Sequence, residues 1–113
     1  MGFNEEVSTA LSNMLAQKIL TAEGNHKRLE TEQKQCIQDA AQSKLELLVV
    51  RRTSLNPGLP DRVAKENSLR GKINDARDRH DKATKELETI KADLQMYQGI
   101  KADAQKGALQ LTA

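Results

Sequence analysis

The chain has 113 residues, of which 37% are hydrophobic, 30% charged and 2% aromatic, with a formal net charge of +2 and a mean hydropathy of −0.69. This length predicts one domain, residues 1–113, and the scarcity of large rings argues against a thick globular core. Residues 1–55 hold 7 basic and 7 acidic side chains and residues 56–113 hold 11 and 9. Without a polybasic arm, nucleic acid is not an expected partner.

The first half of the chain is predicted to form one long helix, over about residues 4–52. A mostly apolar stripe recurs in steps of three and four, with Ser43 as a polar member, at Leu15, Ile19, Ala22, His26, Leu29, Gln33, Cys36, Ala40, Leu47 and Val50. Gly24-Asn25 interrupts this stripe, and glycine often caps a helix C-terminus. Two helices divided near Gly24 are therefore the alternative, although we favour a continuous helix.

The only strong helix breaker is the segment 53–60, which includes Asn56-Pro57-Gly58-Leu59-Pro60. Proline lacks the amide donor and clashes with the preceding helical turn, so two prolines and a glycine this close predict a turn. Pro60-Asp61 has the features of a helix start, because an acidic side chain is favoured in the first turn.

The second half is predicted to form a helix over about residues 61–105, followed by a frayed tail at 106–113. Its apolar positions alternate in steps of four and three for about four heptads, which is typical of a coiled coil. This hairpin seam comprises Leu69, Ile73, Ala76, His80, Ala83, Leu87, Ile90, Leu94 and Tyr97. Acid-before-base pairs at four-residue spacing, such as Glu66/Arg70 and Asp75/Arg79, suit an exposed helical surface.

Together these patterns predict an all-α fold, a long antiparallel helical hairpin in the form of a two-helix coiled coil. If the turn centres near Pro57, residue i faces approximately residue 114 minus i. Leu69 is then expected opposite Leu45, Ile73 opposite Ala40-Ala41, and Leu94 near Leu20.

The chain has more apolar surface than this seam requires, since a two-helix seam needs only about two apolar positions in seven. Large exposed apolar patches usually mark interaction sites, so we expect a protein partner or further copies of the chain, in a larger helical bundle. Basic side chains at the hairpin tip could also contact an acidic partner surface or a phosphate. The predicted partner-binding residues are Phe3, Val7, Leu11, Met14, Leu45, Leu47, Leu48, Val49, Val50, Arg51 and Arg52.

No catalytic, cofactor or metal site is predicted. Cys36 and His80 fall on the seam within about a turn of each other, but zinc needs further ligands and a thiolate nucleophile needs a pocket around it. The predicted register separates His26 from His80. The glycines are scattered and form no phosphate-binding loop. An enzymatic function is therefore disfavoured.

The favoured function is that of a structural or adaptor subunit that acts through helix packing. The alternatives are a small inhibitor or chaperone that uses its apolar faces on one target, and a weak nucleic-acid-binding module based on Arg51, Arg52 and Arg62. No signal peptide or membrane span is expected, because the densest apolar run, residues 45–50, is far shorter than the roughly 20 residues that cross a bilayer. We expect a cytoplasmic location or a place in a soluble assembly.

Overall fold

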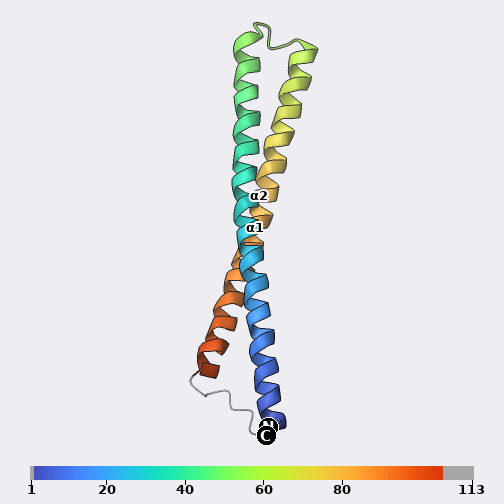
Figure 1. The fold of residues 1–113 in the computed structure, drawn as a ribbon. Coiled ribbons are helices and arrows are strands. Elements are labelled where there is room, and N and C mark those ends of the chain that lie inside the picture. The colour runs from blue at the N-terminus through green and yellow to red at the C-terminus, as the bar shows by residue number, and fades with distance from the viewer. Residues whose placement is uncertain (1, 106–113) are drawn as a thin grey trace. The chain divides into compact units, whose positions relative to one another are not determined.

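The computed structural model describes residues 2–105, and it places them in two α-helices joined by one loop (Figure 1). Helix α1 spans Phe3–Thr53 and helix α2 spans Pro60–Gln105, with no strand among the described residues. The predicted all-α helical hairpin is thereby confirmed. The tail predicted to be frayed, residues 106–113, lies outside the described residues.

Helix α1 has favourable charges at both ends. Glu5 and Glu6 lie in its first turn, while Arg51 and Arg52 lie in its last turn. Acidic groups at a helix N-terminus and basic groups at a C-terminus complement the helix dipole. The helix runs without interruption through Gly24 and Asn25, so the alternative of two helices divided near Gly24 is wrong. A single glycine weakens a helix by only about 1 kcal/mol, which packing readily offsets.

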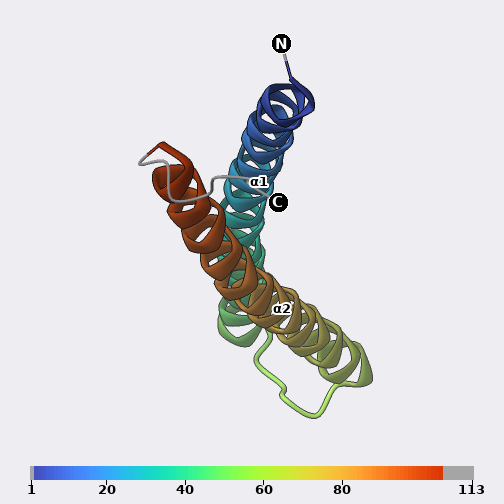
Figure 2. The ribbon, with the colours of Figure 1, turned by 90° about the horizontal axis from the view of Figure 1, so that it is seen from below.

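Figure 2 shows the loop between the helices, and Asn56 lies within it. The Gly58 amide donates to the Asn56 side-chain Oδ1 at 3.0 Å, and the Leu59 amide donates to the Asn56 backbone carbonyl at 3.3 Å. Pro60 is the first residue of α2, a position where the missing amide hydrogen has no helical acceptor to lose. The loop therefore turns the chain where the prolines predicted.

The described chain divides into two units, and each contains part of both helices. Residues 29–85, with the loop, form what we call the turn unit. Its core is the cluster of Leu47, Val50 and Leu69, against which Ile73 packs. The other buried side chains of this unit are small or slender for the most part: Leu29, Cys36, Ser43, Ala76 and Ala83.

The second unit, which we call the terminal unit, comprises residues 2–28 and 86–105 among those described. Four apolar side chains are buried in it, namely Leu15, Ile19, Ala22 and Leu87. They come from both helices, so this unit too is held by an apolar seam.

The pairing of the helices in the turn unit differs from the predicted register. Leu69 clusters with Leu47 and Val50, whereas its predicted neighbour, Leu45, is 57% exposed. Gln33 Nε2 donates to Thr84 Oγ1 at 2.9 Å, although the predicted register places residue 81 opposite Gln33. The observed offset is thus about three residues, or about 4.5 Å at the rise of an α-helix.

Candidate interaction surface

The nine residues of the predicted hairpin seam lie on the inner side of α2. Buried members are Leu69, Ala76, Ala83 and Leu87, and half-buried members are Ile73, His80, Ile90, Leu94 and Tyr97. Ala76 and Ala83 are the small members, and they let the two helices approach closely in the turn unit. These residues belong to the internal packing of the hairpin. The candidate interaction surfaces therefore lie on the outer faces of the helices.

The apolar run near the end of α1 divides between the core and the surface. Leu47 is 2% exposed and Val50 is 9% exposed, so both are core residues and not partner-binding residues as predicted. The correction follows from helical geometry, since consecutive side chains point about 100° apart and a run of six must face several directions. Leu45, Leu48 and Val49 remain 57%, 49% and 51% exposed.

One residue of this surface was missed by the sequence analysis. Ile37 is 59% exposed on the same helix, and it stands four residues before Ala41, which stands four before Leu45. With Leu48 these positions follow helical spacing and share one side of α1. We call Ile37, Ala41, Leu45 and Leu48 the outer stripe. The spacing was visible in the sequence, but the adjacent seam at Cys36 and Ala40 obscured it.

The predicted N-terminal surface is partly accessible. Phe3 and Met14 are 78% and 67% exposed, while Val7 and Leu11 are half-buried in the terminal unit. This surface therefore offers two prominent side chains with partly covered neighbours. It is less continuous than the outer stripe.

Glu66 is the centre of a cluster of positive charges near the loop. Its Oε1 atom lies 3.1 Å from Arg62 Nε and 3.6 Å from Arg51 Nε, and its Oε2 atom lies 3.8 Å from Arg70 Nη2. Arg62 also donates to the Ser54 carbonyl at 2.7 Å, which ties α2 to the end of α1. The hydrogen bond from Arg62, reinforced by the charges of the nearby arginines, lowers the pKa of Glu66.

This cluster includes two of the basic residues that were predicted to be available for binding at the hairpin tip. Arg51 and Arg62 both contact Glu66, although the Arg51 side chain is still 40% exposed, and Arg52 is exposed as well. Charges used in this way hold the loop against the helices. They are less available to a phosphate or an acidic partner than the sequence suggested.

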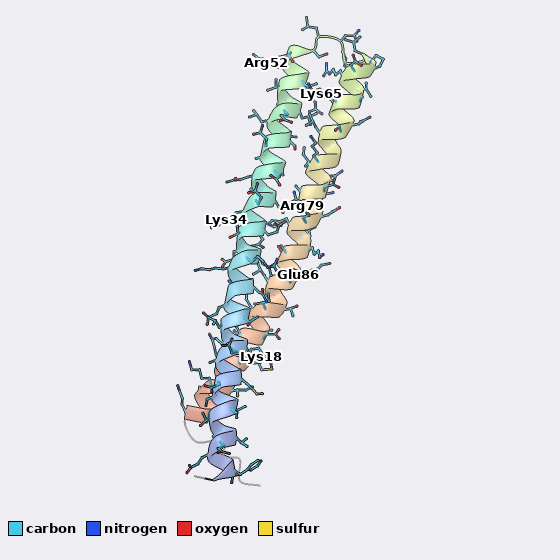
Figure 3. The ribbon with its side chains drawn as sticks, turned by 45° about the vertical axis from the view of Figure 1, so that its right-hand side comes forward. Lys18, Lys34, Arg52, Lys65, Arg79 and Glu86 are labelled. Atoms are coloured by element: carbon cyan, nitrogen blue, oxygen red, sulfur yellow. The ribbon has the colours of Figure 1, made fainter. Side chains whose placement is uncertain are left out.

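A second charged cluster joins the helices in the middle of the turn unit. Arg79, which the spacing pairs with Asp75, reaches across to α1 (Figure 3). Its Nη2 atom donates to Asp39 Oδ2 at 2.9 Å, and its Nη1 atom donates to Glu32 Oε1 at 3.4 Å. The hydrogen bonds that Asp39 accepts from Arg79 and Gln35 lower the pKa of its carboxyl.

The only cysteine of the chain is a core residue. Cys36 is 1% exposed, and its thiol donates to Glu32 Oε1 at 3.5 Å. Burial, followed by the hydrogen bond to Glu32, raises the pKa of this thiol. A buried thiol with a raised pKa is a poor nucleophile, because the thiolate is the reactive form. Cys36 thus acts as a small apolar side chain between the helices.

The turn unit offers little that resembles a small-molecule site. An open groove of about 410 Å³ in the turn unit is lined by Asp39, Gln42, Ser43, Glu46, Lys72, Asp75 and Arg79. Ligand pockets are mostly apolar with a few polar groups, whereas this groove is lined by charges of both signs. Within residues 2–105, no cluster of three or more His, Cys, Asp or Glu side chains is placed to hold a metal ion.

Neither described helix has a stretch long and apolar enough to cross a membrane. Comparison of the chain with protein-family models, with curated proteins and with solved structures gives no match. The class of protein is therefore defined by its architecture: an all-α helical hairpin with an apolar outer stripe on α1.

Proposed function

We propose that this chain is a non-enzymatic structural or adaptor subunit, which acts by packing helices against those of other subunits in a homo-oligomer or a larger protein assembly. The observation that carries the proposal is the outer stripe of α1. The stripe remains exposed, although the side chains of the neighbouring hairpin seam already pack against one another. We place this subunit in the cytoplasm or in a soluble assembly.

Burial of the outer stripe would be favourable. Each Å² of apolar surface removed from water contributes about 25 cal/mol, and Ile37, Leu45 and Leu48 are each close to half exposed or more. Their spacing presents a straight ridge along a helix, which fits the groove between the side-chain ridges of another helix. A helical partner therefore suits this face.

The alternative function, a small inhibitor or chaperone, uses the same exposed faces in a groove of one target protein. The two functions differ in what the purified chain does alone. A structural subunit associates with itself or stays in its assembly, whereas an inhibitor remains a monomer or dimer until its target is added. The nucleic-acid alternative is weaker, since Arg51 and Arg62 are engaged by Glu66.

The proposal is tested by Leu48→Asp, which places a charge in the outer stripe without entering the core. We expect the particle mass, measured by light scattering, to fall toward the 12.6 kDa of one chain, and any copurifying protein to be lost. Asn67→Asp, at an exposed position of α2, is the matched control and should change neither. Unchanged mass and unchanged retention of partners in Leu48→Asp would contradict the proposal.

A further inference from the structure

We infer that the occupant of the outer stripe is a second copy of this chain, packed antiparallel along α1 with Ala41 at the twofold axis. This inference rests on the proposed function, which requires a helical partner but does not say which one. It is carried by the way in which charged side chains flank the stripe in the turn unit.

The stripe extends beyond its apolar centre to a charged side chain at each end. In chain order its positions are Glu30, Lys34, Ile37, Ala41, Leu45, Leu48 and Arg52, all of them exposed and all in the turn unit. Figure 3 shows Lys34 and Arg52 on the side of α1 that faces away from α2. The stripe therefore has an apolar centre from Ile37 to Leu48, with Arg52 beyond one end and Lys34 followed by Glu30 beyond the other.

A twofold interface needs a surface that is complementary to itself. When two α1 helices run antiparallel with Ala41 facing Ala41, residue n of one copy faces residue 82 minus n of the other. Ile37 then faces Leu45, so large apolar side chains meet on both sides of the axis. Ala41 at the centre is small enough for the helices to come close together.

The charges agree with the same register. Glu30 of one copy faces Arg52 of the second copy, and the twofold axis makes this pairing twice. Glu30 already takes part in an interaction of its own chain, but a carboxylate can accept from more than one donor. Lys34 faces Leu48, where the methylene stem of the lysine can cover the leucine while the ammonium group stays in water.

Other arrangements of the same stripe are less favourable. In a parallel pair, Glu30 faces Glu30, Lys34 faces Lys34 and Arg52 faces Arg52, so every charged position meets its like. An antiparallel pair shifted by four residues places Lys34 opposite Arg52. Like charges across an interface disfavour the wrong pairing, which favours the register centred on Ala41 over these two arrangements.

The register can be tested with single cysteines introduced into a Cys36→Ala background. Under mild oxidation, Ala41→Cys should form a covalent dimer, because residue 41 faces itself. Leu48→Cys alone should not form one, because residue 48 faces residue 34 of the second copy. The two introduced cysteines are therefore 14 positions apart, which is about 21 Å along a helix. A disulfide needs Cα atoms about 4.4–6.8 Å apart.

A mixture of Lys34→Cys and Leu48→Cys chains supplies the positive control for position 48, since it should give a crosslinked heterodimer. Circular dichroism of each variant checks that the hairpin is folded. Crosslinking of Leu48→Cys with itself would indicate a parallel pair and overturn the inference. Failure of Ala41→Cys to crosslink in folded protein at a concentration where the wild type is a dimer would also overturn it.

Exchange of the end charges gives a second test. Glu30→Arg and Arg52→Glu should each weaken dimerisation about two- to tenfold, as expected for exposed ion pairs, and the double variant should recover the wild-type constant. A parallel dimer would not recover, because like charges would still meet. Absence of recovery would therefore contradict the antiparallel register.

These results are separable from the test of the proposed function. If the wild type is a monomer that holds a different protein through Leu48, the inference fails and the proposed function stands. If Leu48→Asp alters no association at all, the proposed function fails as well.

Discussion

At the scale of single residues, two carboxylates and two arginines connect the helices of the turn unit most clearly. Glu66 of α2 lies near Arg51 of α1, and Asp39 of α1 accepts from Arg79 of α2. Each contact uses a charge that the sequence alone would place on a solvated helix surface. The native state therefore prefers both carboxylates in their ionised form.

Glu66 should make the stability of the hairpin sensitive to acid. Its pKa is lowered in the folded state from an ordinary value of 4.5, so its contribution is fully present above about pH 4.5 and is lost as the pH falls through the lowered value. Urea unfolding at neutral pH and at pH 3 should show a smaller loss of stability on acidification for Glu66→Gln than for the wild type. Glu88→Gln, at an exposed position, is the control, and an acid response of Glu66→Gln equal to that of the wild type would contradict the assignment.

Cys36 should report on opening of the turn unit. Because its thiol is 1% exposed and burial raises its pKa, we expect reaction with a disulfide reagent at pH 8 to be at least about 100-fold slower in native protein than in urea, as the thiolate is the reactive species. Absorbance of the released chromophore measures the rate. A native rate equal to that of the unfolded chain would show that Cys36 is not held between the helices.

At the scale of elements, α1 is continuous because its seam outweighs the local preference at Gly24 and Asn25. Helix propensities amount to less than about 1 kcal/mol per residue, whereas the seam on either side of Gly24 includes the buried Ala22 and Leu29. In the loop, by contrast, local preference decides the structure. The prolines and Asn56 end the helix there, and no local packing outweighs them.

Gly24→Ala should therefore stabilise the protein by about 0.5–1 kcal/mol, because alanine loses less backbone entropy in a helix. A Cβ atom at this position meets nothing within 4 Å, and the same is true of Gly71 in α2. Gly71→Ala is thus the matched variant and should give a similar gain in thermal unfolding. A loss of stability in Gly24→Ala alone would indicate that α1 needs glycine there.

At the scale of the whole molecule, the hairpin presents two apolar surfaces with different roles. The inner seam folds the chain, and we propose that the outer stripe joins it to another subunit. Leu47 and Leu48 illustrate the division, since these neighbours are 2% and 49% exposed. Their substitution should therefore affect different measurements.

Leu47→Ala should cost about 2–5 kcal/mol in the free energy of unfolding, as for other leucines removed from a core. Leu48→Ala should cost less than about 1 kcal/mol in the isolated chain but should weaken association. Urea titration in dilute solution measures the first effect, and sedimentation over a range of concentrations measures the second. Equal destabilisation by both variants in dilute solution would contradict the division into inner and outer surfaces.

The sequence by itself determined the all-α hairpin, the position of its loop and the side of each helix that turns inward. Apolar spacing of three and four residues specifies an angle around the helix axis, and proline chemistry specifies where the helix must end. Both are local properties that can be recognised without knowledge of the partner helix. All nine predicted heptad positions of α2 are accordingly buried or half-buried.

Only the tertiary structure decided how far one helix slides along the other, and therefore which residues meet. Periodicity fixes no axial offset, which depends on the loop geometry and on pairs such as Gln33–Thr84 and Arg51–Glu66. The structure also resolved the double assignment of Leu47 and Val50, which the sequence placed both on the apolar stripe of the first helix and among the partner-binding residues, since both are buried in the core. A run of adjacent apolar residues is ambiguous until a second helix covers one side of it.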